Sequence, residues 1–400
     1  MLINDFCGEQ VSRLGFGTMR LPLNADKSVC EAETARMIGY ALEHGVNYFD
    51  TAWPYHGGKS EIVVGRILSG YDRKSYFLAD KYPGHQWVTR HDPAALFEQQ
   101  LEKCRVDYFD YYLLHNVCEN SFETYTDSTW RIAEYFAEQK RLGRIRHLGL
   151  STHSRLSHLK TVLDTFPDAT DFVQIQLNYL DWTLQEGAGK YELLTGRDIP
   201  IITMESVRGG MLSALPPAWA QKLSALRPGE TGTGWALRFL QGLSGCKVIL
   251  SGMSSLEQMR ENIATFENGA PLTKAEIDTL FSVGAALSKD RVPCTGCRYC
   301  TEDCPQGLDI PALMLAYNNM KTGASGFTPG MYLESLPEGK RPEDCLKCGA
   351  CKRICPQGID IPAVLEECVK LAPTQPNWRR ICAEREQEAL RLAAEKAGQK

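Results

Sequence analysis

Short apolar runs recur through residues 1–270, and segments with apolar residues at helical intervals lie between them. The runs predict eight strands, at residues 14–18, 46–50, 76–81, 109–115, 146–151, 172–176, 199–204 and 246–251. Helices are expected between them, for example at residues 33–45, 60–70, 92–104 and 256–267. Strand followed by helix, repeated in this way, is typical of a (β/α)8 TIM barrel. An open doubly wound sheet also alternates, but its usual Gly-x-Gly-x-x-Gly turn after an early strand is missing from this sequence.

A cysteine pattern follows the predicted barrel and occurs twice. The spacing Cys-x2-Cys-x2-Cys-x3-Cys-Pro begins at Cys294 and again at Cys345. Three evenly spaced thiolates suit one [4Fe–4S] cluster, and in bacterial two-cluster ferredoxins the fourth cysteine ligates the other cluster. This predicts two sets of cluster ligands: Cys294, Cys297, Cys300 and Cys355, and Cys345, Cys348, Cys351 and Cys304.

Zinc sites and disulfides are the alternatives for these cysteines. Tetrahedral zinc requires neither the third evenly spaced cysteine nor the terminal Cys-Pro. Disulfides are not expected in a chain without an export signal. The pattern therefore favours two [4Fe–4S] clusters. Seven further cysteines lack ligand spacing, and most are expected to be buried in the core: Cys7, Cys30, Cys104, Cys118, Cys246, Cys368 and Cys382.

Composition narrows the class of protein. An apolar fraction of 43% and a charged fraction of 23% describe an ordinary globular chain of 400 residues. The net charge of −5 makes nucleic acid an improbable partner. We see no signal peptide and no run long enough to span a bilayer, so we expect a cytoplasmic protein that does not bind membranes.

The sequence divides into four segments. Residues 1–270 form the barrel, 271–291 a helical connector capped by Thr273, 292–372 a mainly α-helical ferredoxin-like domain, and 373–400 a charged C-terminal helix on the surface. The segment between Cys304 and Cys345 exceeds what a small ferredoxin needs, so we expect it to form a helix and a loop that pack on the barrel. A helix after the second cysteine motif would carry an apolar stripe that includes Cys368.

Polar residues end three successive predicted strands, where such a barrel places its active site. Asp50 ends the second strand and Tyr55 follows it, Lys81 ends the third, and His115 ends the fourth. Reduction of a carbonyl requires an acid beside the oxygen. Tyr55 can be that acid if the Lys81 cation, held by Asp50, stabilises its phenolate. His115 can donate a hydrogen bond to the carbonyl. Each residue alone more often has a structural role, but their joint occurrence in strand order favours a reductase site.

The same segments resemble the successive blocks of the aldo-keto reductase superfamily, over residues 10 to 268. The similar stretches are FDTAWPYHGGKSE, LADKYP, YYLLHN, LGLSTHS, DFVQIQLNY and SGMSSLEQMREN. With its two-cluster tail, the chain resembles a bacterial subgroup that fuses the reductase barrel to a ferredoxin-like module. The resemblance implies that the family's catalytic tetrad falls on Asp50, Tyr55, Lys81 and His115, in agreement with the chemistry above.

The resemblance also implies NADP(H) or NAD(H) bound across the barrel mouth. The implied contacts are Gly17, Thr18, Ser151, Gln174, Gln258 and Asn262. Glu205 stands where an aromatic residue usually stacks on the nicotinamide, and Gly252 and Gln258 stand where NADPH-specific members carry basic residues. Arg208 or Arg260 could supply that charge instead, although nothing in the sequence requires it. Alternatively, Ser254, Gln258 and Asn262 only cap and cover a helix start.

Three functions remain open, because nicotinamide delivers two electrons together whereas each cluster passes one. The barrel is expected to reduce a small carbonyl compound, or oxidise an alcohol, with NAD(P)H, while the clusters exchange electrons with a ferredoxin or another redox protein. Alternatively, the clusters feed single electrons to the substrate with little use of nicotinamide. In the third case the clusters are structural or sense oxygen, and the catalysis is that of an ordinary reductase.

Overall fold

The computed structural model of the chain describes residues 1–85, 92–119, 121–267, 269–289, 291–292, 294, 299–302, 304–321, 328–355 and 358–397. Its larger part is a closed barrel of eight parallel strands in the order β10-β3-β4-β5-β6-β7-β8-β9. The strands are β3 (Leu14–Gly17), β4 (Tyr48–Asp50), β5 (Phe77–Tyr82), β6 (Phe109–Leu114), β7 (Ile145–Thr152), β8 (Val173–Gln176), β9 (Ile201–Met204) and β10 (Cys246–Gly252). Each lies within two residues of its predicted range, which confirms the TIM barrel.

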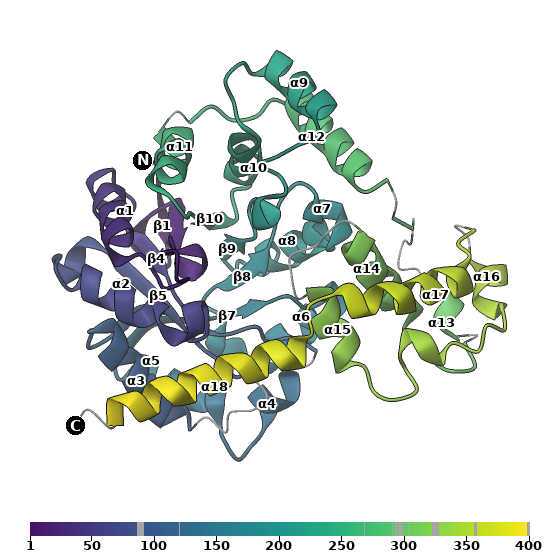
Figure 1. Cartoon of the computed structure of the whole chain (residues 1–400), viewed down its shortest axis with the longest axis horizontal. Helices are drawn as coiled ribbons and strands as arrows, with labels where there is room; N and C mark the ends of the chain where they lie inside the picture. Colours follow the sequence, from purple (N-terminus) through teal and green to yellow (C-terminus); the bar gives the residue numbers. More distant parts are fainter. Residues whose placement is uncertain are drawn as a thin grey trace.

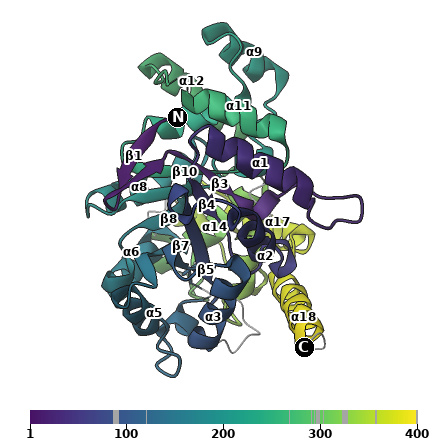
Figure 2. The same cartoon turned by 90° about the vertical axis from the view of Figure 1, so that its left-hand side faces the viewer.

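Helices surround the barrel, as Figures 1 and 2 show. The longer ones are α1 (Glu31–Glu43), α2 (Ser60–Leu68), α3 (Pro93–Cys104), α5 (Ile132–Arg141), α6 (Leu156–Thr165), α8 (Gly187–Thr195), α9 (Pro217–Leu226), α10 (Gly232–Gln241) and α11 (Leu256–Glu267). Short helices follow β3, β4, β6 and β8, namely η1 (Thr18–Arg20), η2 (Tyr55–Gly58), α4 (Phe122–Thr126) and α7 (Asp181–Leu184). Their apolar faces and the strands form one large hydrophobic core.

A hairpin that the sequence did not predict covers the opposite end of the barrel from the strand ends that carry the site. It consists of β1 (Ile3–Phe6) and β2 (Glu9–Ser12), which pair antiparallel. Phe6 stacks on Tyr111 with ring centroids 4.7 Å apart and meets Phe172 edge-on. The Tyr111 hydroxyl donates to the Phe6 carbonyl over 3.1 Å. This closes the barrel floor with aromatic packing and keeps water out of it.

The C-terminal part is a separate helical body with its own apolar core. The connector helix α12 (Lys274–Leu287) begins at a capping box of Thr273 and Glu276, as predicted for Thr273. Beyond it lie α13 (Tyr299–Glu302), α14 (Ile310–Lys321), α15 (Thr328–Ser335), α16 (Ala350–Ile354) and α17 (Ile361–Leu371). Cys368 on α17 is fully buried in this core, as expected, so it is a packing residue. We call this body, residues 291–371, the cluster module.

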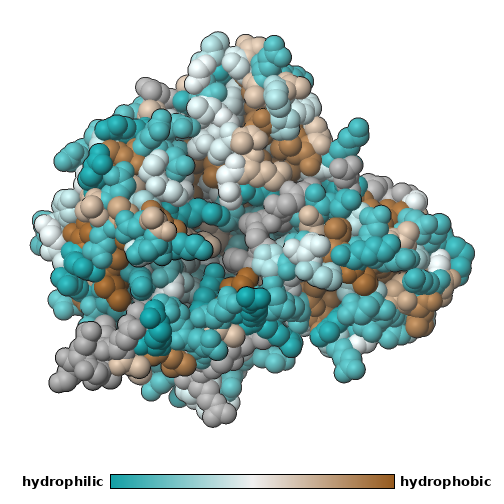
Figure 3. Space-filling view, in the orientation of Figure 1, coloured by the Kyte–Doolittle hydropathy of each residue, from teal (hydrophilic) through white to brown (hydrophobic). Residues whose placement is uncertain are grey.

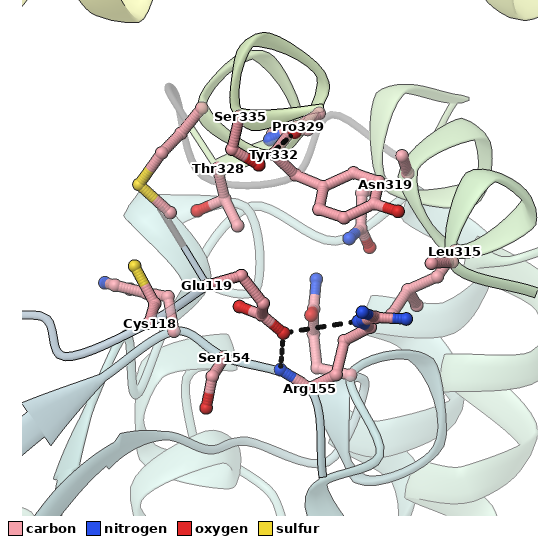
Figure 4. A pocket seen from close by; sticks show the side chains of 15 residues that line it. Cys118, Glu119, Ser154, Arg155, Leu315, Asn319, Thr328, Pro329, Tyr332 and Ser335 are labelled. Atoms are coloured by element: carbon pink, nitrogen blue, oxygen red, sulfur yellow. Dashed lines mark hydrogen bonds and ion pairs between the residues drawn. The ribbon is translucent and has the colours of Figure 1, made fainter. Parts of the chain in front are cut away.

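The cluster module packs on the barrel through the segment between its two cysteine motifs. That segment contains two helices, α14 and α15, where the sequence predicted one. Arg155, after β7, donates to Asp309 of the module over 2.5 Å and to Glu119 of the barrel over 3.2 Å. Figure 4 shows Glu119 and Arg155 facing Tyr332 and Ser335 across this junction. These partly buried ion pairs connect the two bodies at this junction.

The C-terminal helix α18 (Trp378–Ala397) runs from the module back across the barrel (Figure 1). The predicted helix is present, but it is not simply a charged surface helix. Its Trp378 and Cys382 are buried against Cys118 of the barrel and Met331 of α15. Its Glu388 side chain lies over Gly57 of η2. Helix α18 therefore bridges the cluster module and the turn that carries Tyr55. In the described part of the chain, no helix is long and apolar enough to cross a bilayer.

Candidate active site

The predicted tetrad converges at the C-terminal ends of β4, β5 and β6. The Lys81 ammonium donates to Asp50 Oδ1 over 2.5 Å and to the Thr51 carbonyl over 2.6 Å. Lys81 is fully buried and Asp50 is 1% exposed. Burial alone would lower the pKa of Lys81, but the Asp50 carboxylate outweighs it and the pKa is raised. Lys81 is therefore a permanent cation at the base of the site.

Tyr55 lies above that cation on η2. The Lys81 ammonium is 5.0 Å from the centre of the Tyr55 ring. Burial raises the pKa of Tyr55 above its usual value of 10.0, while Lys81 opposes that rise. The cation acts in the direction expected from the sequence but does not outweigh burial. Tyr55 consequently keeps its proton at neutral pH and is available as a donor.

His115 faces Tyr55 from the end of β6. The two rings meet edge-on with centroids 6.2 Å apart, and His85 lies 4.4 Å from His115 on another side. Burial, together with His85 and Lys81, holds the pKa of His115 well below 6.5. The imidazole is therefore neutral at pH 7, and as a neutral ring it can donate one hydrogen bond.

A cavity of about 580 Å³ opens above these residues. Its volume suits a ligand larger than a few atoms. It is lined by the barrel residues Asp50, Tyr55 and His115 and by Trp378 and Arg385 of α18. In the space-filling view of this side, the molecule is hollowed near its centre, above α18 (Figure 3). Helix α18 is thus part of the wall of the cavity at the barrel mouth.

The structure sorts the residues implied for nicotinamide into two groups. Gly17, Gln174, Gln258 and Asn262 line the cavity. The carbonyl oxygen of the Gln174 side chain is buried and has no hydrogen-bond partner among the described residues. Such an acceptor fits a carboxamide donor, because unpaired buried polar atoms are costly.

The other two lie beneath the lining. Thr18 is buried, and its hydroxyl donates to the Asp50 carbonyl over 2.9 Å. Ser151 pairs with Gln174 in the register of β7 and β8, and its hydroxyl accepts from the Asn116 amide over 2.8 Å. Both side chains support the strand ends. Gln258 and Asn262 also bond to the protein, at Ser254 and Ser251 respectively, so their capping role is present as well.

Glu205 and Arg20 also line the cavity. Glu205 is held in the left-handed region at φ 57°, and burial raises the pKa of its carboxyl group. The aliphatic part of Arg20 lies over Gly252, 3.4 Å from where a Cβ would stand. Arg208 is buried and paired with Asp181, so it is not available to a phosphate. Arg20 is a lining cation beside Gly252, and no periodic pattern in the sequence predicted it.

Several other residues of the cavity were not predicted from the sequence. His85 and His153 come from loops after β5 and β7, and Trp378 and Arg385 come from a helix more than two hundred residues beyond the barrel's tetrad. His85 and Trp378 stack with ring centroids 5.9 Å apart. The sequence pointed to these residues only through the histidines in the loops that follow the strands. Trp182, in the segment after β8, packs on Tyr191 and Phe239.

The cysteines gather in the module as the pattern predicted. Cys304, Cys345, Cys348 and Cys351 line one small cavity, which is the second predicted ligand set. Cys294, Cys300 and Cys355 contribute to the same core, and Cys297 lies outside the described residues. Among described residues, no three His, Cys, Asp or Glu side chains converge closely enough for a single metal ion. These four thiols surround one cavity without converging on a single point. This suits a four-iron cube, in which each thiolate binds a different iron, better than one zinc ion that all four ligands must reach at about 2.3 Å.

The remaining cysteines are mostly core residues, as expected. Five of the seven are buried, while Cys7 and Cys30 are partly exposed. Burial raises the pKa of the Cys246 thiol to about 12. The Cys246 thiol is therefore protonated at neutral pH.

Comparison with known proteins agrees with this geometry. Residues 13–285 match the model of the aldo/keto reductase family. The chain belongs to that family. Residues 293–359 match a 4Fe-4S dicluster domain. Both findings confirm the predicted combination of a reductase barrel with an iron–sulfur module, and the chain is an oxidoreductase of the aldo-keto reductase type.

Individual relatives cover the barrel. The uncharacterized oxidoreductase YqkF of Bacillus subtilis is 26% identical over 68% of this chain and 92% of its own. L-galactose dehydrogenase of Arabidopsis thaliana is 26% identical over 64% of this chain and 85% of its own. The structure of the aldo-keto reductase AKR11C1 from Bacillus halodurans, in its holo form, aligns with a TM-score of 0.57 at 25% identity, covering 71% of this chain and 96% of that one. The alignment with AKR11C1 therefore covers the barrel of this chain and leaves most of the cluster module outside.

Proposed function

We propose that the barrel reduces a small carbonyl compound, or oxidises the matching alcohol, using NAD(P)H, with Tyr55 as the general acid. The observation that carries this proposal is the buried Lys81–Asp50 pair beneath a protonated Tyr55 at the floor of a ligand-sized cavity. A bound nicotinamide supplies the hydride. The unpaired Gln174 oxygen and the free space above Gly17 support its binding there.

In this mechanism the protein handles the proton and the orientation of the carbonyl. Neutral His115 donates a hydrogen bond to the carbonyl oxygen and fixes its direction. Tyr55 transfers its proton to that oxygen as negative charge develops on it. Lys81 lowers the cost of the resulting phenolate, and Asp50 holds Lys81 in place. Helix α18 narrows access of water to this spot.

We further propose that the cluster module holds two [4Fe–4S] clusters that exchange electrons with a ferredoxin or another redox protein. Support comes from the packing of the module on the barrel at Arg155 and Asp309. His153 lines both the catalytic cavity and the small pocket between barrel and module, so the two lie back to back. We also propose the four segments predicted from the sequence (residues 1–270, 271–291, 292–372 and 373–400) and a cytoplasmic location. Thr18 and Ser151 act in it by supporting the strand ends.

The test combines one variant with one titration. Tyr55→Phe keeps the ring but removes the hydroxyl proton, so carbonyl reduction should fall by about 100-fold or more, while iron content and the visible cluster absorbance stay unchanged. Retained turnover would exclude Tyr55 as the acid.

The titration tests whether electrons pass from the nicotinamide to the clusters. NADPH and then NADH are added anaerobically to the purified protein while cluster absorbance is followed. Bleaching would show that electrons from nicotinamide reach the clusters. Absence of bleaching, in protein whose clusters dithionite still reduces, would contradict a direct link between nicotinamide and the clusters.

A further inference from the structure

Arg385 of α18 is a cation at the wall of the catalytic cavity and has no carboxylate partner within the described part of the chain. It lines the cavity together with Tyr55, His115 and Trp378. It is partly buried, and its guanidinium lies 6.0 Å from the centre of the Trp378 ring. Among described residues, it makes no ion pair, whereas its neighbours Arg380 and Arg391 on the same helix pair with Glu384 and Glu388. Burial of an unpaired charge is costly unless a ligand supplies the counter-charge.

The position of Arg385 is fixed by the helix that carries it. The Glu334 carboxylate of α15 accepts from the backbone amides of Trp378 and Arg379 over 2.8 and 2.9 Å. Trp378 is 1% exposed and stacks on His85, which in turn touches His115. Arg385 is about two helical turns beyond Trp378, on the helix that contacts the catalytic turn η2. A guanidinium held in this way is preorganised for an anion.

We propose that Arg385 binds the carboxylate of the substrate, so that the enzyme acts on carbonyl compounds that also carry a carboxylate group. This rests on the proposed carbonyl reduction at Tyr55. Two arginines line the cavity in the described chain. Arg20 lies near Glu205 and Gly252, whereas Arg385 is close enough to Tyr55 and His115 to act on both electrostatically. A single guanidinium matches a carboxylate in a bidentate pair, whereas a phosphate dianion calls for several donors.

The reaction balances with the proposed co-substrate. The carbonyl carbon gains the hydride of NAD(P)H, and its oxygen gains the Tyr55 proton, giving a hydroxy acid and NAD(P)⁺. The carboxylate is unchanged and stays paired with Arg385. Bulk water then restores the proton on Tyr55.

The experiment compares matched probes. The probes for catalysis are 4-carboxybenzaldehyde and its neutral methyl ester, and the unreactive probes for binding are benzoate and benzamide, measured by calorimetry on the cluster-loaded protein. In Arg385→Leu we expect kcat/KM for the carboxylated aldehyde to fall roughly 10- to 100-fold, with the ester unchanged. Benzoate binding should be lost, and Arg385→Lys should recover part of both. Arg380→Leu removes a charge from the outer face of the same helix and should change neither.

Several results would overturn the proposal. Equal losses for the acid and the ester, with a shifted pH profile, would mean that Arg385 tunes Tyr55 instead of binding substrate. Weaker NADPH binding with unchanged benzoate binding would assign Arg385 to the cofactor. If no carbonyl compound is reduced, the proposed function fails, and the benzoate titrations alone decide whether Arg385 holds a carboxylate. Should Arg385→Leu fold poorly, Arg385→Gln keeps the polarity and serves the same comparison.

Discussion

Lys81 keeps its charge in a place that water does not reach. Its ammonium lies on Asp50 and on the Thr51 carbonyl, and both side chains are buried. Replacing such a pair by apolar groups is often neutral or stabilising, so stability alone does not explain it. The effect of Lys81 on Tyr55 does explain the buried pair, because the Lys81 cation lowers the pKa of the Tyr55 hydroxyl while burial raises it.

A pH profile tests this role of Lys81. Reduction needs protonated Tyr55, whose pKa is raised, so kcat/KM should be flat at neutral pH and fall only above the usual value of about 10. In Lys81→Met the pKa of Tyr55 rises further, so the alkaline limb should move to higher pH while the plateau drops. Because this variant leaves Asp50 unpaired, it should also lose about 3–5 kcal/mol of stability. The double variant with Asp50→Asn should recover stability but not activity; an unmoved alkaline limb would contradict the assignment.

Arg20, beside Gly252 in the cavity wall, offers a second test. Because its side chain lies over Gly252, where basic residues are expected in NADPH-specific relatives, it can meet the 2′-phosphate instead. In Arg20→Ala the Kd for NADPH should rise about tenfold, with the Kd for NADH unchanged. Arg36→Ala, which removes an exposed arginine paired with Glu33, is the control. Equal weakening of both nucleotides would refute a phosphate contact.

The candidate site could be predicted only where it belongs to the barrel strands. Asp50, Lys81 and His115 end strands, and in a parallel barrel these ends meet by construction. Trp378 and Arg385 reach the same cavity from a helix whose docking depends on tertiary contacts with Cys118 and Met331. Tertiary contacts of this kind leave no local pattern in the sequence. The sequence of α18 shows a charged helix, and its buried stripe is too short to mark a second surface.

At the scale of elements, long apolar strands were predictable and short mixed ones were not. The barrel strands are buried on both faces and appear as continuous apolar runs. The strands β1 and β2 have four residues each, with exposed and buried positions mixed. Their stability comes from Phe6 packing into the barrel floor. An isolated hairpin of that length is marginal in water, so its sequence signal is weak.

Helix α18 should behave as a hinged wall of the cavity, held by one buried residue. Trp378 is among the largest fully buried side chains and lies between His85 and Met331. Trp378→Ala removes that anchor, and we expect faster hydrogen exchange across α18 with unchanged exchange in β4–β6. Truncation of a buried aromatic side chain typically lowers stability by about 3–5 kcal/mol. We expect this loss to exceed the free energy that holds a peripheral helix in place. Trp219→Ala, on the remote helix α9, should leave α18 unchanged, and slow exchange in the Trp378 variant would show that other contacts hold the helix.

At the scale of the whole molecule, the cluster cysteines connect to the catalytic cavity through a continuous set of contacts. Cys300, Cys304 and Cys351 share a core with α14 and α17. Helices α14 and α15 pack together, and Glu334 of α15 caps α18, which carries Trp378. The clusters, if bound as proposed, thereby support the cavity wall in addition to any role in electron transfer.

Removing one cluster should therefore change the cavity. In Cys351→Ala we expect loss of one cluster, measured as iron and visible absorbance, since the module core loses a ligand that cross-links it. Hydrogen exchange should accelerate in α14–α18, and benzoate binding should weaken because Arg385 loses its fixed position. NADPH binding should persist, since Gly17, Gln174 and Asn262 belong to the barrel and its separate core. Cys30→Ala, which changes a partly exposed barrel thiol, is the control. Unchanged exchange in α18 after cluster loss would show that the wall stands without the clusters and that their role is in electron transfer alone.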